Sequence, residues 1–291
     1  MKYLKECSWI LKGVLAVLLA GVLSLSPLGF PRVPHEKKLE LVWADEFEGD
    51  AIDTDKWEGC YCNSTDIYRR RGSYWNTDMA TVKDGTLHIR TTYYPEGYNG
   101  NGLPGWYTCG LDTNGRFAQT YGYFETRCIL PKGCGLWAAF WLVPHSMNSQ
   151  DYGTLENSGE DGAELDVFES AFFDSKTPRR VTSNIHIDGW GPYHQSANAC
   201  KPFVLFNDPY EDYNTYGMAW DEDGYTFYIN GIKTGHSDFG GASKVPEYLI
   251  LSVEVGGTNA VPAEDWAGGP LTPDSETTDF VVDYVRVYQF K

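Results

Sequence analysis

The sequence predicts an all-β protein whose structured part forms one domain. Short apolar or alternating segments recur from residue 39 to residue 290, and Gly, Pro, Asn and Asp separate them. No segment after the amino-terminal region shows the apolar period of an amphipathic helix. Tyr, Phe and Trp number 20, 14 and 10, and aromatic side chains favour strands. About ten to twelve strands without helices predict a β-sandwich or a β-barrel.

The apolar pattern and the turns between apolar segments place the strands. Asp84-Gly85, Asp223-Gly224 and Asn230-Gly231 are dipeptides that favour tight hairpin turns. The expected strands cover residues 39–47, 81–90 as a hairpin, 121–130, 136–143, 163–170, 181–187, 213–233 in three pieces, 247–255 and 279–290. Irregular structure is expected at 52–57 and 60–74, a long surface loop at 93–107 and a polar loop at 145–161.

Residues 163–170 (AELDVFES) carry three carboxylates on a segment that otherwise suits a strand. Alternate side chains of a strand share a face, so Glu164 and Asp166 point the same way. Glu169 breaks this alternation, unless one inserted residue forms a β-bulge and turns the side chains that follow. We predict such a bulge, which brings all three carboxylates onto one surface.

A carboxylate cluster of this kind suits the chemistry of glycoside hydrolysis. Retaining glycosidases use two carboxyl groups about 5 to 5.5 Å apart, one as nucleophile and one as acid/base. One group must be ionised while the other is protonated, and a third carboxylate helps to separate their pKa values. The alternative is a solvated strand face that holds three acids. Because three anions on a small face reduce stability, we favour a functional site.

Residues near the acidic strand are candidates for substrate binding. Trp137 and Trp141 differ by four positions and therefore share a face of their strand. Trp190 follows the strand that contains His186, which is either a ligand contact or a structural histidine. A tryptophan is most often a core residue, yet flat aromatic faces beside carboxylates form a platform for pyranose rings. We expect at least one of these tryptophans to stack on a sugar.

The charge of the chain limits its ligands. The formal net charge is −17 at pH 7, whereas nucleic-acid binding needs clustered cations, so we expect no nucleic-acid partner. A neutral polysaccharide substrate suits this acidic protein better, and we expect a monomer. Arg69-Arg70-Arg71 is a basic run that we interpret as a solvated loop face rather than as a contact with an anionic sugar.

The amino-terminal residues have the features of an export signal. The chain begins with Lys2 and Lys5 and continues through an apolar stretch, residues 13–25. This stretch is shorter than the roughly 20 residues of a spanning helix, although its extension to residue 30 would serve as an anchor. We therefore expect residues 1–30 to be a signal peptide or membrane anchor and residues 39–291 to be a catalytic domain. The expected location is secreted or extracellular, with or without a retained anchor.

Cysteines and standard motifs exclude several other chemistries. Besides Cys7 the chain has six cysteines, and export would permit disulfides among them. No histidine pair stands at zinc spacing, so a metal-thiolate site is not expected. The G-x-S-x-G, P-loop and H-E-x-x-H motifs are absent from the sequence. No cofactor is expected for catalysis.

From residue 41 to residue 289 the chain resembles family 16 of the glycoside hydrolases, the group of laminarinases, lichenases and agarases. The ELDVFE motif resembles the bulged E-x-D-x-x-E signature of that family. The motifs that carry the resemblance stand in the order of the family: LVWADEF (41–47), YGYFETR (121–127), LPKG (130–133), GLWAAFWL (135–142), ELDVFE (164–169) and VDYVRVY (282–288).

The resemblance implies a concanavalin A-like jelly roll of two curved antiparallel sheets, with substrate across the concave face. It implies Glu164 as the nucleophile, Glu169 as the acid/base and Asp166 as the group that tunes both.

Family members often hold a structural calcium ion on the convex side of the sandwich. Glu46, the backbone of Gly85 and Asp283 match those positions, and oxygen ligands suit calcium. A charge at a strand edge is the alternative for Asp283.

The sequence departs from the family at positions related to substrate specificity. The frequent Trp-Pro-Ala-x-Trp is WAAFW (137–141), and a Ser-Gly-Arg stretch of laminarinases is Cys109-Gly110-Leu111. The expected activity is that of an exported, endo-acting, retaining β-glycanase that hydrolyses β-1,3- or mixed-linkage β-1,3-1,4-glucan by double displacement. A β-galactan such as agarose is the alternative substrate, and a non-catalytic carbohydrate-binding protein is the alternative function.

Overall fold

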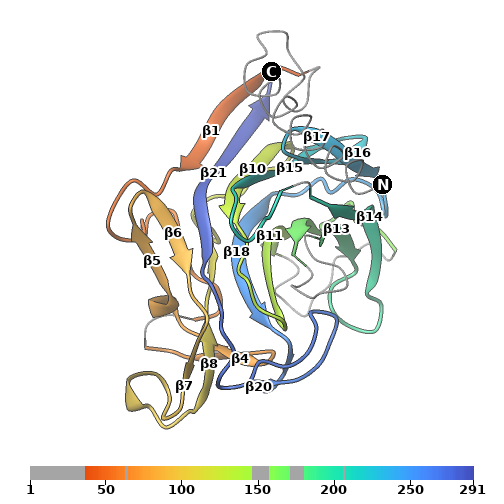
Figure 1. The fold of residues 1–291 in the computed structure, drawn as a ribbon. Helices are drawn as coiled ribbons and strands as arrows, with labels where there is room; N and C mark the ends of the chain where they lie inside the picture. Colours follow the sequence, from red (N-terminus) through yellow and green to blue (C-terminus); the bar gives the residue numbers. More distant parts are fainter. Residues whose placement is uncertain (1–36, 63–64, 146–156, 171–179, 206) are drawn as a thin grey trace, which may run out of the picture.

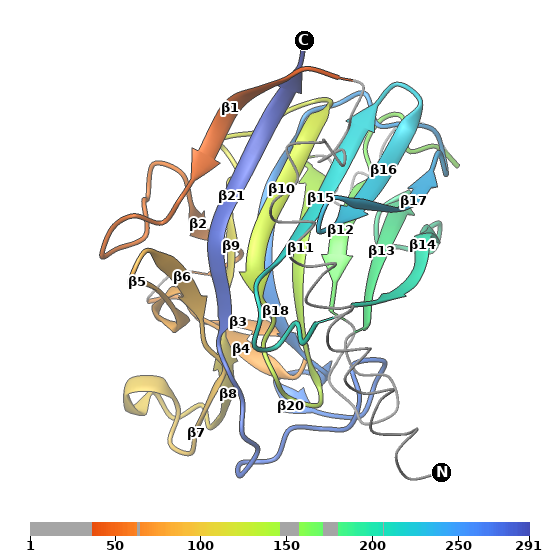
Figure 2. The same cartoon turned by 45° about the horizontal axis from the view of Figure 1, so that its top comes forward.

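Two large antiparallel sheets form the body of the protein (Figure 1). The structure is a computed structural model, and it describes residues 37–62, 65–145, 157–170, 180–205 and 207–291. The first sheet has eight strands in the order β17-β16-β15-β10-β21-β6-β5, with β1 paired to β21. Figure 2 shows β21, β10 and β15 running side by side in this sheet. Its strands are β1 (Leu39–Asp45), β5 (Ala80–Lys83), β6 (Thr86–Ile89), β10 (Gly122–Ile129), β15 (Asn214–Asp221), β16 (Gly224–Ile229), β17 (Ile232–Ser237) and β21 (Phe280–Phe290).

The second sheet has seven strands in the order β14-β13-β12-β11-β18-β9-β2 and contains the acidic strand β12. Its strands are β2 (Glu58–Gly59), β9 (Gly110–Asp112), β11 (Leu136–Pro144), β12 (Glu164–Glu169), β13 (Arg180–Ile187), β14 (Gln195–Val204) and β18 (Glu247–Val255). The described residues contain no α-helix, so the predicted all-β sandwich is confirmed. No helix among them has the length and apolar character that a membrane crossing needs. The predicted leader, residues 1–30, lies outside the described residues.

Two predictions of irregular structure, at 60–74 and 93–107, are wrong at the ends of these segments. The short strands of a four-stranded sheet, in the order β3-β4-β8-β7, lie there. Its strands are only three or four residues long, and β4 pairs in parallel with β8, which is distant in the chain. The local sequence pattern therefore does not predict them. The elements concerned are β3 (Tyr68–Arg70), β4 (Ser73–Trp75), β7 (Thr92–Tyr94), β8 (Gly105–Thr108), the 3-10 helices η1 (Thr77–Met79) and η2 (Tyr98–Gly100), and the hairpin of β19 (Gly257–Thr258) and β20 (Val261–Pro262).

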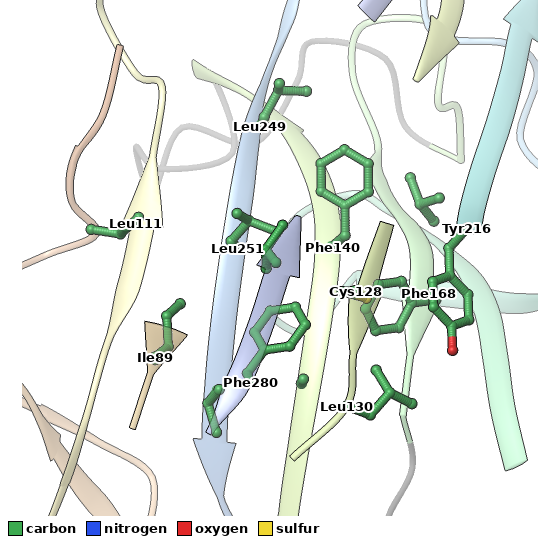
Figure 3. Packing of buried hydrophobic residues seen from close by; sticks show 14 of the residues in the cluster. Ile89, Leu111, Cys128, Leu130, Phe140, Phe168, Tyr216, Leu249, Leu251 and Phe280 are labelled. Carbon is green, nitrogen blue, oxygen red and sulfur yellow. The ribbon is translucent and has the colours of Figure 1, made fainter. Parts of the chain in front are cut away.

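The core lies between the two large sheets (Figure 3). The ring centre of Phe168 lies 4.3 Å from that of Tyr216 and 6.3 Å from that of Phe280, both on the eight-stranded sheet. Phe140 and Val167 also face this core, as the alternation predicts. Burying one such side chain stabilises the fold by about 1.5 to 3 kcal/mol. One face of the seven-stranded sheet is therefore buried in the core, and its other face is available for a binding site.

The predicted hairpin turns are confirmed at two places. Asp84 and Gly85 have φ values of 53° and 74°, and Asn230 and Gly231 have values of 50° and 78°. Two successive residues with positive φ make the type I′ turn, which suits the twist of paired strands. These turns connect β5 to β6 and β16 to β17.

Candidate active site

A β-bulge in β12 brings the three carboxylates to one cleft. The step from Asp166 to Glu169 covers three residues on β12 but only two on the partner strand β13, so one residue is inserted. The register against β11 shifts at the same place. The predicted bulge is therefore confirmed. The cross-strand pairs are Glu164 with His186, Asp166 with Asn184 and Glu169 with Thr182.

The cleft lies on the face of the seven-stranded sheet that is turned away from the core, and its volume is about 510 Å³. Along β11, Trp137 and Trp141 line the cleft, whereas Phe140 between them faces the core. The three predicted catalytic residues and the four predicted sugar-binding residues all lie in its walls. The lining residues are Arg70, Arg71, Trp137, Ala139, Trp141, Glu164, Asp166, Glu169, Thr182, Asn184, His186, Trp190, Asn198, Ser252, Glu254 and Trp266.

Burial dominates the electrostatics of the carboxylate cluster. The pKa of Glu164 is raised well above its usual range, first by burial and then by the charges of Asp166 and Glu169. Burial and the charge of Asp166 also raise the pKa of Glu169, against the amide of Asn184, which donates a 2.6 Å hydrogen bond to Glu169. Like charges this close disfavour full ionisation, so the cluster can hold a proton near neutral pH. Acid/base chemistry needs such a proton.

His186 lies against the middle carboxylate of the cluster. Its Nε2 is 3.2 Å from Oδ2 of Asp166, an ion-pair distance at an angle that does not make a hydrogen bond. Its Nδ1 is 2.8 Å from Nε2 of His194, and the ring of Trp190 covers both histidines. The sequence alone is compatible with either a ligand contact or a structural role for His186. The structure gives it contacts to the cluster and a place in the wall of the cleft.

Two arginines of the basic run line the cleft, which corrects their interpretation as a solvated loop face. Nε of Arg70 donates a 2.8 Å hydrogen bond to the buried carboxylate of Glu254, so this cation is neutralised. The guanidinium of Arg71 lies 5.1 Å from the ring centre of Trp137. Among the described residues no carboxylate forms an ion pair with Arg71.

Exposed tryptophans flank the carboxylates. Trp190 is 52% exposed and lies beside His186, which pairs with Glu164. Trp266 is 44% exposed and its ring centre is 4.9 Å from that of Trp137, beyond the Glu169 end of the cluster. Flat apolar faces therefore lie on both sides of the acidic groups.

Several lining residues were not predicted, and only some of them have a local signal in the sequence. Thr182 and Asn184 alternate with His186 on β13, so the strand period would have placed all three on one face. Ser252 and Glu254 alternate on β18 in the same way. Arg71 and Trp266 come from loops of other parts of the chain, and nothing in their neighbourhoods points to the cleft. Only the tertiary structure brings them there.

The predicted calcium ligands do not form a ready oxygen site. Both carboxylates are neutralised by arginines, Glu46 by Arg286 at 2.8 Å and Asp283 by Arg127 at 2.5 Å. Gly85 lies in the β5–β6 turn. These residues do not fit a calcium ion in this arrangement.

Within the described residues, one cluster of three metal-ligating side chains exists, and it belongs to the cleft. Oxygen or nitrogen atoms of Glu164, Asp166 and His186 lie within 4.8 Å of one another. The bulge places Glu164 and Asp166 on the same surface as Glu169, so we interpret this cluster as a site of acid/base chemistry.

Residues 39–290 match the family model described as Beta-porphyranase A-D, GH16 domain. The glucan endo-1,3-beta-glucosidase A1 of Niallia circulans is 30% identical over 90% of this chain, which spans 39% of that longer protein. Beta-porphyranase B of Zobellia galactanivorans is 28% identical, with 89% of this chain and 87% of that protein covered.

A solved structure confirms the architecture. The laminarinase catalytic domain of Thermotoga maritima superposes with a TM-score of 0.67 at 24% identity, covering 87% of this chain and 99% of that domain. Such a likeness shows a shared jelly roll of two sheets. Together with the family match over nearly the whole described chain, it shows that this protein is a glycoside hydrolase that belongs to glycoside hydrolase family 16.

Proposed function

We propose that this protein is an endo-acting, retaining β-glycanase. The observation that carries the proposal is the bulged strand β12, which presents Glu164 and Glu169 to one cleft with Asp166 between them. Exposed Trp190 and Trp266 on either side let a polymer chain extend past the carboxylates in both directions. That arrangement suits cleavage within a chain.

Two displacement steps at the anomeric carbon account for the roles of the carboxylates. The carboxyl group of Glu169 protonates the glycosidic oxygen while the carboxylate of Glu164 attacks the anomeric carbon. The bond from this carbon to oxygen breaks, and an ester joins Glu164 to the sugar. The ionised Glu169 then takes a proton from water, whose oxygen attacks the same carbon and releases Glu164. The negative charge of Asp166 favours the protonated form of Glu169 before the first step.

We infer that the substrate is a β-galactan that carries anionic groups such as sulfate esters. Arg71 supports this, because its guanidinium lies in the cleft on Trp137 and pairs with no described carboxylate. A guanidinium makes strong, bidentate contacts to anionic oxygens. The porphyranase description of the matching family model points the same way.

A β-1,3- or mixed-linkage glucan is the second candidate substrate. The relative from Niallia circulans is named a glucan endo-1,3-beta-glucosidase, and the formal charge of −17 disfavours the approach of a polyanion. A neutral glucan would offer Arg71 no anionic group, and the charge of Arg71 would then act only on Glu169, whose pKa it lowers.

We also propose that the protein acts outside the cytoplasm. The apolar stretch at residues 13–25 has the composition of an export signal. Detection of the protein in the culture medium or on the cell surface of its source would test this.

The function is tested by incubating the full chain with laminarin, mixed-linkage β-glucan, agarose and a sulfated agar-type galactan. Reducing ends and polymer length are followed together, with Glu164→Gln as the inactive control. We expect cleavage of the sulfated galactan, a fall in polymer length that precedes most of the release of reducing ends, and a β-anomer as the first product by proton NMR. An initial α-anomer would exclude retention, and binding without cleavage would indicate a carbohydrate-binding protein instead.

A further inference from the structure

A chain of two side-chain hydrogen bonds leads from Glu169 to the edge of the cleft. Nδ2 of Asn184 on β13 donates a 2.6 Å hydrogen bond to Oε2 of Glu169. Nδ2 of Asn198 on β14 donates a 2.5 Å hydrogen bond to Oδ1 of Asn184. The strands β12, β13 and β14 that carry the three residues lie side by side in the seven-stranded sheet (Figure 2), and all three side chains line the cleft. Both distances are short for hydrogen bonds from an amide to an oxygen.

The register of the sheet and the bulge of β12 place these side chains together. Asn184 and Asn198 are direct partners in the ladder between β13 and β14. The direct partner of Glu169 is Thr182, which is buried and lies 3.5 Å from Nδ2 of Asn184 through its hydroxyl group. Among the described residues, no side chain other than Asn184 forms a hydrogen bond with the carboxyl group of Glu169. The orientation of this carboxyl group therefore depends on the amide of Asn184.

The acid/base of a retaining glycosidase needs a hydrogen-bond partner that suits two forms of its carboxyl group. It gives a proton to the leaving oxygen in the first step and takes one from water in the second, so it is protonated before one step and ionised before the other. An ionised carboxyl group only accepts hydrogen bonds, whereas a protonated one also donates. A primary amide has two N–H donors on one branch and an acceptor oxygen on the other. A half-turn of its terminal bond therefore serves both forms.

We propose that Asn198 is a positioning residue that acts on Glu169 through Asn184. When Glu169 is ionised, Asn198 donates to the carbonyl oxygen of Asn184 and so keeps the N–H groups of Asn184 directed at the carboxylate, as in the structure. When Glu169 is protonated, its O–H donates to the carbonyl oxygen of Asn184, and the N–H of Asn184 donates to the carbonyl oxygen of Asn198. This inference rests on the proposed function for its catalytic consequence, whereas the hydrogen-bond chain belongs to the free protein.

The exposure of the two asparagines matches this division of roles. Asn184 is half-buried between Glu169 and Asn198, so its amide has a partner on each side in either orientation. Asn198 is exposed, so its amide has room to turn and water satisfies the branch that faces away from Asn184. An apolar side chain at position 198 would leave Asn184 with no partner that fixes the orientation of its amide. The carboxyl group of Glu169 would then lose its fixed orientation in both steps.

The test compares two substrates of the full-length protein that differ in their need for an acid. The first is the polymer that the protein cleaves, and the second is a dinitrophenyl glycoside of the oligosaccharide that it releases, whose leaving group departs without a proton. In Asn198→Ala we expect kcat/KM on the polymer to fall by about 3- to 10-fold, and kcat/KM on the dinitrophenyl glycoside by less than about twofold.

The second step is measured with the same dinitrophenyl glycoside. The turnover that follows the initial release of dinitrophenol reports the attack of water on the ester of Glu164, which needs Glu169 as base. This turnover should also fall by about 3- to 10-fold in Asn198→Ala, and azide, which needs no base, should restore it. Asn198→Gln keeps an amide and should retain more of each rate than Asn198→Ala.

Ser196→Ala is the matched control. Ser196 is exposed and lies two residues before Asn198 on the same face of β14, so its loss should leave every rate within about twofold. Equal losses on the polymer and on the dinitrophenyl glycoside in Asn198→Ala would overturn the inference, because a merely structural role affects both substrates alike. Unchanged rates in Asn198→Ala would overturn it as well.

A measurement on the free protein separates this inference from the proposed function. In carbon NMR without substrate, Asn198→Ala should shift the carboxyl signal of Glu169, and Ser196→Ala should not. An unchanged signal in Asn198→Ala would refute the link through Asn184, whatever the protein hydrolyses. Failure to cleave any polysaccharide would instead refute the proposed function, and the carboxyl signal would still decide whether Asn198 acts on Glu169.

Discussion

The guanidinium of Arg71 lies 5.1 Å from the ring centre of Trp137, so one wall of an acidic cleft carries a cation on a flat aromatic face. Arg71 follows β3 and has a φ of 48°, in the left-handed region. Its carbonyl oxygen accepts a 2.7 Å hydrogen bond from the backbone N–H of Ala260, in the β19–β20 hairpin. The turn is therefore tied to a neighbouring hairpin, and the backbone conformation orients the side chain toward the cleft.

Arg71→Met should separate anionic from neutral polymers. If Arg71 binds a sulfate group, its loss removes a charge-assisted contact worth about 1.5 to 3 kcal/mol, a fall of roughly 10- to 100-fold in kcat/KM on the sulfated galactan. Arg71→Lys has the same backbone strain and should retain part of the activity. Activity on a neutral polymer should fall less in Arg71→Met, because only the effect of the charge on the pKa of Glu169 and the packing on Trp137 are lost there. Equal losses on both polymers would show that Arg71 supports the cleft and does not recognise charge.

Removal of each catalytic carboxylate should give a distinct chemical product. In Glu169→Ala, kcat/KM should fall by about 10²- to 10⁴-fold because the leaving oxygen is no longer protonated. Azide can then attack the ester on Glu164 and yield a β-glycosyl azide from an activated substrate. In Glu164→Ala, azide replaces the nucleophile and should yield the α-product. NMR of the azide adducts assigns the roles, and the opposite pattern would exchange them.

Phe140→Ala should destabilise the sandwich from its centre. Phe140 is fully buried between the sheets, and removing a phenyl ring from such a site costs about 3 to 5 kcal/mol. Ile232→Ala at a 46% exposed position is the control, with an expected change within about 0.5 kcal/mol. Urea unfolding followed by fluorescence measures both. A small change in stability for Phe140→Ala would mean that this side chain of β11 does not face the core.

Gly110→Ala should disturb the wall that supports the cleft. A Cβ atom at Gly110 would lie 2.5 to 3.1 Å from three ring atoms of Trp75, whose indole N–H donates to the carbonyl of Val253 on β18. Such overpacking costs about 1 to 3 kcal/mol. Gly49→Ala is the matched control, because its nearest contact would be 3.7 Å. Unfolding by urea compares the two variants, and equal stabilities would contradict the tight contact.

Glu247 should make the stability of the protein fall as the pH rises. Burial raises the pKa of Glu247 to about 8, although its Oε1 accepts a hydrogen bond from the backbone N–H of Ala163, next to Glu164. The folded pKa lies above the unfolded value of about 4.3, so the folded state binds more protons between these values. Stability contributed by Glu247 is therefore full below about pH 4.3 and is lost progressively up to about pH 8.

Glu247→Gln provides the measurement for this effect. Between roughly pH 5 and 8, Glu247 should lower the free energy of unfolding of the unaltered protein by up to about 1.4 kcal/mol per pH unit. This contribution should be absent in Glu247→Gln. Denaturant titrations at several pH values compare the two proteins, and other groups contribute equally to both. Parallel stability curves would show that Glu247 is ionised in the folded protein.

Local patterns explain why much of the architecture could be predicted. The strands β10, β11, β18 and β21 are long and follow the apolar pattern that burial of one or both faces imposes. Asn230-Gly231 marked a hairpin because few other residues adopt two positive φ values in succession. By contrast, β14 (QSANACKPFV) lies at an edge of its sheet and has no apolar alternation, so it was missed. The four-stranded sheet depends on pairing between distant segments.

The sequence by itself determined the all-β class, the acidic strand and the need for a bulge at Glu169, because these follow from the two-residue period of a strand. Only the tertiary structure decided that Arg71, Glu254 and His194 surround that strand, and that burial raises the pKa of its glutamates. The physical reason is that contact and desolvation depend on distances in space. These arise when segments that are distant in the chain, such as those of Arg71 and Glu254, pack against one sheet.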